Sequence, residues 1–178
     1  MKAYNAKDIR NIAIAGHSGR GKTTLAEAML FLAKATDRLG RVADGTTVLD
    51  FDAEEKRRKV TIATAMAAFD WNNTKINLLD TPGLFDFAGG VSEGMRAAES
   101  ALIVLAAGSG VDVGAEKAYK AASERTARHT SATHFQAIGF CGLSGSNIFF
   151  YNFKYIHVTP FQKRKKHLSF SKRKQQVP

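Results

Sequence analysis

The segment GHSGRGKT at residues 16–23 has the residue types and spacing of a loop that binds phosphate. It fits the pattern G-x-x-x-x-G-K-[ST] and stands between an apolar segment and a segment of helical periodicity, which is the context this pattern needs. Its glycines let the backbone wrap an anion with N–H groups pointing inward, at a helix N-terminus whose dipole favours negative charge. Lys22 is expected to reach the β- and γ-phosphates of a nucleotide, and the Thr23 hydroxyl to bind Mg²⁺. The alternative is a glycine-rich turn that only caps a helix.

A carboxylate follows at the end of the apolar segment INLLD, where a protein with such a loop needs one to hold the magnesium shell. This is Asp80, and the turn TPG after it leaves the Gly83 N–H free to face a γ-phosphate. Thr61, just before another apolar segment, is placed to offer Mg²⁺ a second hydroxyl. An ordinary Pro-Gly turn and a threonine that merely starts a strand are the alternatives. The predicted metal ligands are therefore Thr23, Thr61 and Asp80, and the predicted nucleotide-binding residues are Gly16, His17, Ser18, Gly19, Arg20, Gly21, Lys22, Thr23, Thr24, Asp80, Thr81, Pro82 and Gly83.

The hydrophobic pattern predicts the elements that must position these residues. Short apolar segments predict strands at 10–15, 61–71, 75–79 and 101–107, with a turn at 72–73. Apolar side chains at helical spacing predict helices around 25–33, 91–98 and 115–122. Polar and charged composition predicts a long loop at 36–60, and the aromatic segment 148–158 favours a strand. Alternating strands and helices predict an α/β fold, a three-layer sandwich of the P-loop NTPase kind around a mostly parallel sheet.

Composition is that of an ordinary globular protein. Of the 178 residues, 44% are hydrophobic and 24% are charged, and the longest strongly apolar run, at 101–108, is far too short to span a bilayer. The single cysteine excludes an internal disulfide, and the N-terminus has no apolar stretch typical of a secretory signal. We therefore expect a cytoplasmic protein with no membrane partner.

Charge is unevenly distributed along the chain. Residues 126–178 hold nine of the 26 Lys and Arg residues, none of the 16 Asp and Glu residues, and nine aromatic residues. Residues 1–125 are nearly neutral. The sequence therefore predicts two segments, a nucleotide-binding part at 1–125 and a basic, aromatic tail at 126–178.

Three long segments resemble the start of a translational GTPase of the elongation factor G type: GHSGRGKTTL, GRVADGTTVLDFDAEEKRRKVTIATA and INLLDTPGLFDFAGGVSEGMRAAESALIVLAAGSGVDVGAE. The resemblance runs from about Ile9 to Arg125 and includes the loop between the two phosphate-binding motifs. It implies a translational-type G domain that binds GTP and GDP with Mg²⁺ and docks on the ribosome. It also implies a role in translocation or ribosome rescue.

The chain departs from this family at three positions that bear on catalysis. Gly19 stands where the family usually has Asp, and Arg58-Lys59 stand where it usually has Arg-Gly. Leu84 replaces the histidine that positions the attacking water in the family. An isobutyl side chain neither orients water nor accepts a proton, so the sequence predicts nucleotide binding with slow hydrolysis and names no certain catalytic residue.

The guanine-reading motif Asn-Lys-x-Asp of this family does not occur in the chain, and no Asp or Glu follows Glu124. Two explanations stay open. Residues 126–178 are either a genuine extension that contacts RNA weakly through charge and stacking, or a non-native extension of a truncated G domain, for instance after a shifted reading frame. Two other functions stay open as well: a non-catalytic, basic RNA- or ribosome-binding module with a vestigial P-loop, and an ATP-using P-loop enzyme.

Overall fold

The computed structural model describes residues 3–106, 110–126, 136–140 and 150–152, which form a six-stranded sheet with helices on both faces. The strands lie in the order β2-β3-β1-β4-β5-β6. The four inner strands run parallel, while β2 and β6 are antiparallel to their neighbours at the two edges. The bounds are β1 Ile9–Ala15, β2 Ala65–Trp71, β3 Thr74–Asp80, β4 Ser100–Ala106, β5 Gln136–Phe140 and β6 Phe150–Asn152.

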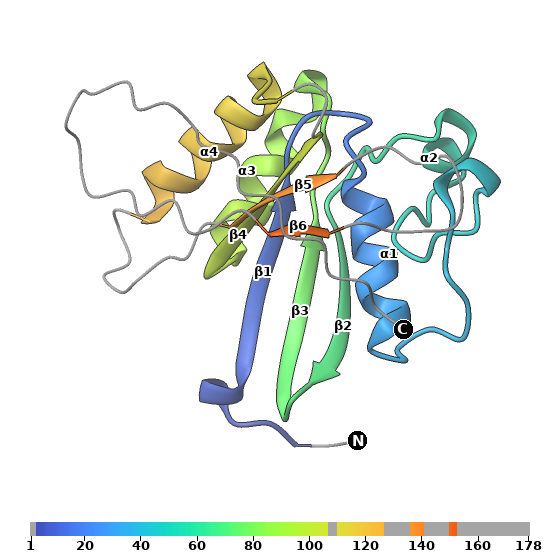
Figure 1. The fold of residues 1–178 in the computed structure, drawn as a ribbon, viewed down its shortest axis with the longest axis vertical. Coiled ribbons are helices and arrows are strands. Elements are labelled where there is room, and N and C mark those ends of the chain that lie inside the picture. The colour runs from blue at the N-terminus through green and yellow to red at the C-terminus, as the bar shows by residue number, and fades with distance from the viewer. Residues whose placement is uncertain (1–2, 107–109, 127–135, 141–149, 153–178) are drawn as a thin grey trace.

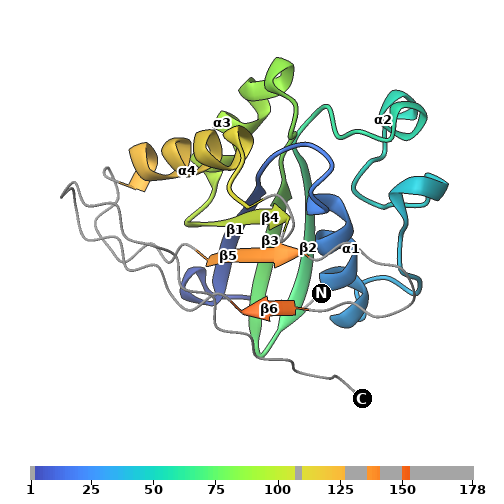
Figure 2. The same cartoon turned by 45° about the horizontal axis from the view of Figure 1, so that its top comes forward.

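Helices cover the sheet on both sides, as Figure 1 and Figure 2 show. Helix α1 (Lys22–Leu32) packs on β1, β2 and β3, whereas α3 (Ala88–Ala97) and α4 (Val113–Thr126) pack on β1 and β4 from the other side. This arrangement confirms the predicted three-layer α/β fold with a mostly parallel sheet. Among the described residues, none of the helices is both long enough and apolar enough to cross a membrane.

Two apolar clusters, one on each face, hold the layers together. Along β1 the side chains alternate: Ile14 belongs to the cluster under α1, while Ala13 and Ala15 belong to the cluster under α3 and α4. The cluster under α1 is built largely from Leu, Ile, Val and Phe, and it includes Leu25, Leu30, Phe69, Leu78 and Val104. The opposite cluster contains five alanines among its seven buried members. Because a parallel strand is buried on both faces, the near-continuous apolar run of β1 is what this position requires.

The hairpin between β2 and β3 agrees with the predicted turn. Asn72 and Asn73 both have positive φ, 47° and 62°, which is the conformation of a two-residue turn that matches strand twist. The pairing begins at Ala65 rather than at the predicted residue 61. Residues 61–64 instead belong to the loop that leads to the phosphate site, described below.

The prediction of an unstructured loop at 36–60 is wrong over its last part, because α2 (Ala53–Arg58) forms there. Its charged sequence lacks apolar periodicity, but Asp52 and Glu55 form a capping box. The Glu54 N–H donates to the Asp52 carboxylate at 2.7 Å, and the Asp52 N–H donates to the Glu55 carboxylate at 3.3 Å. Reciprocal capping at its N-terminus thus stabilises a helix that the hydrophobic pattern does not encode.

Strand β5 was not predicted, and it adds a parallel neighbour to β4. Of the segment 148–158, which was predicted to be a strand, residues 150–152 form β6, and the remainder lies outside the described residues. The basic run at 163–174, on which the predicted RNA contact of the tail depends, also lies outside them.

Replacing Glu55 with alanine is expected to lower the free energy of unfolding by about 2 kcal/mol, because buried donors would lose their acceptor. Besides capping α2, the buried Glu55 carboxylate accepts from the Ile62 N–H at 2.8 Å and the Ala63 N–H at 3.1 Å. Urea denaturation measures the change. Glu54→Ala is the matched control, since the Glu54 carboxylate pairs with two exposed arginines and its loss should barely change the urea midpoint. Equal midpoints for the two variants would contradict the role given to Glu55.

Candidate nucleotide-phosphate site

The glycine-rich loop at 16–21 joins the end of β1 to the start of α1 and has the shape of an anion cradle. Gly16 has φ +142°, and a Cβ there would lie 2.5 Å from the Val104 carbonyl oxygen of the neighbouring strand. Gly21, at the N-cap of α1, has φ 85° and offers no side chain to the free N–H groups of the helix. These N–H groups and the helix dipole together favour an anion at this end of α1.

Lys22 is buried and folds back over the cradle. Its Nζ donates to the His17 carbonyl at 3.0 Å. Burial lowers the pKa of Lys22, and the attraction of Asp80 and Asp112 opposes this effect. Gly83 lies so close that a Cβ there would meet the Lys22 Nζ and would lie 2.7 Å from the Ser18 nitrogen. The turn after β3 and the glycine-rich loop therefore lie directly against each other.

The three predicted metal ligands lie together in the structure. The Thr23 hydroxyl donates to Asp80 Oδ2 at 2.6 Å, and Thr23 Oγ1 lies 3.1 Å from Thr61 Oγ1. The other oxygen of Asp80, Oδ1, is buried and has no hydrogen-bond partner among the residues that the structure describes. Burial raises the pKa of Asp80 to about 7, although the hydrogen bond from Thr23 and the charge of Lys22 act in the opposite direction.

Asp50 completes this group, and sequence reasoning missed it. It is only 2% exposed and accepts from the Thr61 hydroxyl at 2.9 Å and from the Thr47 hydroxyl at 3.1 Å. A threonine hydroxyl has one proton, so Thr61 gives its proton to Asp50 while Thr23 gives its own to Asp80. Both hydroxyl oxygens are thus left with lone pairs, although they lie only 3.1 Å apart. Facing lone pairs favour a cation between or beside them.

The donor set fits Mg²⁺, which prefers hard oxygen ligands in an octahedral shell. Thr23, Thr61 and Asp80 would supply two hydroxyl oxygens and a carboxylate on one side. Within the described part of the chain, no three His, Cys, Asp or Glu side chains gather to hold a metal by themselves. A cation here therefore needs phosphate oxygens and water to complete its shell, as in other phosphate-transferring sites.

A pocket of about 170 Å³ opens beside these residues. Twelve residues line it: Ser18, Gly19, Gly21, Lys22, Thr23, Thr24, Val42, Asp50, Lys59, Val60, Thr61 and Gly83. The lining thus combines the glycine-rich loop and the start of α1, the turn after β3, and residues from the segments before and after α2. Of these parts, only the contributions of Val42, Asp50, Lys59 and Val60 were not predicted.

Several predicted nucleotide-binding residues support the pocket without lining it. The Thr81 hydroxyl donates to the Ile14 carbonyl at 2.8 Å and so holds the turn against β1. Arg20 forms an ion pair with Asp112 at 2.9 Å, which ties the loop to the residue before α4. His17 lies against the Phe85 ring, with the ring centres 5.7 Å apart.

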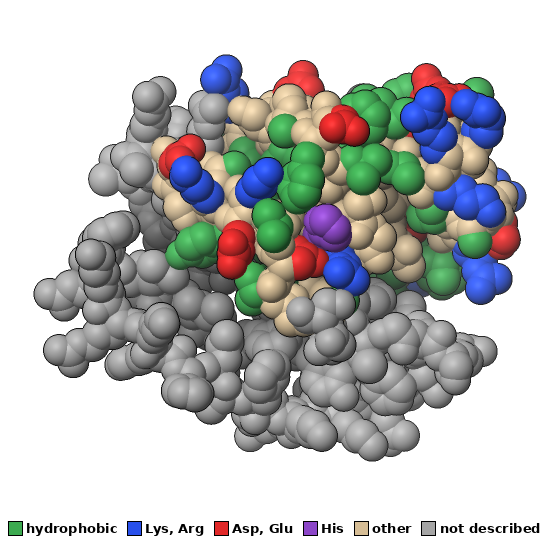
Figure 3. All heavy atoms as spheres, turned by 90° about the horizontal axis from the view of Figure 1, so that it is seen from above, with side chains coloured by type: hydrophobic (Ala, Val, Ile, Leu, Met, Phe, Trp, Pro, Cys, Tyr) green, Lys and Arg blue, Asp and Glu red, His purple; other side chains and the backbone are tan. Residues whose placement is uncertain are grey.

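Leu84 does not line the pocket, and its side chain is 37% exposed. Other apolar residues near it in the chain or before α4 are exposed as well, namely Phe85, Val111 and Val113. The view from above shows hydrophobic side chains exposed among charged ones on this face (Figure 3). No polar side chain therefore comes from position 84 toward the pocket.

Comparison with known proteins agrees with this geometry. The model of the elongation factor Tu GTP binding domain matches residues 7–132. An elongation factor G-like protein of Mycobacterium tuberculosis is 49% identical over 104 residues, which are 58% of this chain and 15% of that protein. A mitochondrial ribosome-releasing factor 2 of Yarrowia lipolytica is 43% identical over 125 residues, 68% of this chain and 16% of that protein.

A crystal structure of a Thermus thermophilus protein superposes with a TM-score of 0.64 at 41% identity, covering 65% of this chain and 18% of that one. The chain spans between 15% and 18% of the length of these three proteins. The resemblance to elongation factor G stated from the sequence is confirmed. Since the match extends over most of its length, the chain belongs to the family of elongation factor Tu GTP binding domains.

Proposed function

We propose that this chain binds GTP and GDP together with Mg²⁺, as the nucleotide-binding part of an elongation-factor-G-like translation factor. The observation that carries the proposal is the group Thr23, Thr61 and Asp80 beside the glycine-rich loop. Their oxygens are oriented to accept a cation, next to a cradle of N–H groups and Lys22. A cation that joins protein oxygens to phosphate oxygens is the arrangement that phosphate transfer needs.

In this proposal each residue acts on a stated part of the nucleotide. The N–H groups of the loop and of the first turn of α1 hold the phosphates, and Lys22 reaches the β- and γ-phosphates. Bound Mg²⁺ would neutralise the charge on the phosphate oxygens. Thr61 belongs to the loop after α2, which Glu55 anchors through the Ile62 N–H. In this proposal a γ-phosphate would hold the Thr61 part of the loop in place, and loss of the phosphate would release that part.

Hydrolysis is proposed to be slow because position 84 supplies no group that orients water. The ribosome is proposed as the partner, since one relative bears the name ribosome-releasing factor 2 and another is an elongation factor G-like protein. The cytoplasmic location expected from the sequence stays a prediction.

Calorimetric titration of the chain with GTP and with GDP, in MgCl₂ and in EDTA, tests the proposal. We expect both nucleotides to bind in MgCl₂ and GTP affinity to fall in EDTA, because the phosphate charge would then repel Asp50 and Asp80. Lack of binding in MgCl₂, by a chain whose circular dichroism shows helix and strand, would contradict the proposal.

The same titration with ATP addresses base recognition. Sites that pair hydrogen-bonding groups with a substrate reject analogues that lack them by about 10⁴-fold. Because the chain lacks Asn-Lys-x-Asp, we expect less than about tenfold preference for GTP over ATP. Strong guanine selectivity would show that another group of this chain reads the base.

A further inference from the structure

Lys59 adopts a backbone conformation that glycine adopts more easily. It ends α2 with φ 57° and ψ 38°, in the left-handed region. Glycine is usual at this position after a helix, because a Cβ is unfavourable there. The backbone at Lys59 would therefore accept glycine at least as well, so the effect of removing this side chain can be tested with glycine.

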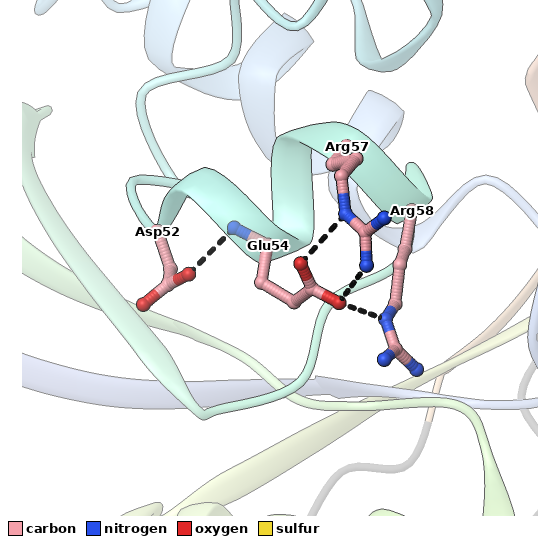
Figure 4. Close-up of polar contacts among 4 residues, drawn as sticks. All are labelled: Asp52, Glu54, Arg57 and Arg58. Atoms are coloured by element: carbon pink, nitrogen blue, oxygen red, sulfur yellow. Dashed lines mark hydrogen bonds and ion pairs between the residues drawn. The ribbon is translucent and has the colours of Figure 1, made fainter.

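The two arginines beside Lys59 are engaged with the same carboxylate, as Figure 4 shows. Arg57 donates to both Glu54 oxygens, at 2.8 and 2.6 Å, and Arg58 donates to Oε1. These hydrogen bonds lower the pKa of Glu54 to about 2. Lys59 shares neither this carboxylate nor any other among the described residues, and it lines the phosphate pocket instead.

The pocket has few other cations to offer a triphosphate. Lys22 and Lys59 are the two basic residues among its twelve lining residues, and Asp50 adds a negative charge. Arg20, next to the glycine-rich loop, is held by Asp112 at 2.9 Å. Lys59 stands two residues before Thr61, in the loop that is proposed to meet the terminal phosphate, whereas Lys22 comes from the first turn of α1.

We propose that Lys59 binds the γ-phosphate of GTP and makes the site prefer GTP over GDP. The inference rests on the proposed function, because it assigns a second cation to the same pocket. An ammonium group that donates to a phosphate oxygen forms a charge-assisted hydrogen bond, which is stronger than a neutral one. GDP lacks the group that Lys59 binds, so its affinity does not depend on this side chain.

Affinities of a non-hydrolysable GTP analogue and of GDP, measured in MgCl₂ for the full chain and its variants, test the inference. Lys59→Gly is expected to lower the affinity for the GTP analogue about tenfold and to change the affinity for GDP less than twofold. The melting temperature should rise, because glycine relieves the left-handed backbone. Lys59→Gln should lower the affinity for the analogue to a similar extent without raising the melting temperature. Lys59→Arg should retain the preference for the analogue over GDP.

Lys34 offers a matched control. It is also a lysine with φ 57°, at the end of α1, and it does not line the pocket. Lys34→Gly should raise the melting temperature in the same way and leave both affinities unchanged. The inference alone would be overturned if the wild-type protein binds both nucleotides and Lys59→Gly leaves the ratio of the two affinities unchanged. Wild-type protein that binds neither would overturn the proposed function as well.

Discussion

Replacing Lys22 with methionine is expected to weaken GTP binding by about 10²-fold or more while the nucleotide-free chain stays folded. Hydrogen bonds to charged groups contribute about 1.5–3 kcal/mol each, and Lys22 is proposed to serve two phosphates. Its ammonium is buried and its pKa is lowered by that burial, so the fold gains little from the charge itself. Methionine keeps the length of the side chain and its packing against the loop.

Calorimetric titration with GTP and GDP measures the loss, and thermal melting of the nucleotide-free chain measures the fold. Lys120→Met is the control, because Lys120 is exposed on α4 and, among the residues that the structure describes, forms an ion pair with Glu124 alone, at 3.9 Å. Both affinities should be unchanged in that variant. Unaltered affinity in Lys22→Met would remove the glycine-rich loop from the proposed function.

Replacing Leu84 with histidine is expected to raise ribosome-stimulated GTP hydrolysis by about 10²-fold or more, the lower range for a placed acid or base. The test uses the elongation factor G-like protein of Mycobacterium tuberculosis with residues 9–125 of this chain in place of its own segment. Nucleotide affinity should change less than twofold, because Leu84 does not line the pocket. Stability should also change little, since the side chain is 37% exposed.

Leu84→Met is the control, because it changes the side chain without adding an acid or a base. It should not raise the rate of GTP hydrolysis. Rapid hydrolysis by the chimaera with Leu84 would show that another residue, of this protein or of the ribosome, positions the water. No gain from histidine would show that the neighbouring Phe85, which contacts His17 and the Lys117 ammonium, holds the turn in a different place.

The glycine-rich loop that the sequence predicts depends on local backbone chemistry. The spacing of Gly16, Gly19 and Gly21 specifies a loop that only residues tolerant of positive φ can form, and all three have positive φ. Lys22 and Thr23 follow at fixed offsets because they occupy the first turn of α1. All of these residues lie within one short segment of the sequence, so the sequence pattern alone identifies them.

The parts that the sequence does not predict depend on contacts between distant segments. Asp50 joins the site through Thr61, and Glu27 accepts from the Val48 and Leu49 N–H groups across the loop. Neither carboxylate stands in a recognisable pattern, because its role comes from where the chain returns in space. Helix α2 was missed for a related reason, since caps and ion pairs rather than an apolar face stabilise it.

The alanine-rich cluster under α3 and α4 has a mechanical consequence. Helices interlock with a sheet through large side chains that interdigitate. The single methyl group of alanine interdigitates little. The layer of α3 and α4 therefore meets the sheet through few large side chains, Leu79 and Met95 among them, while Leu25 and Leu30 fasten α1 on the other face. Interfaces with little interdigitation permit shear, the small sliding of packed elements. Helix α3 follows the turn that contains Gly83, and Thr81 holds the start of this turn on β1, so sliding of this layer would act on the residues after Gly83 while the glycine-rich loop stays fixed to α1.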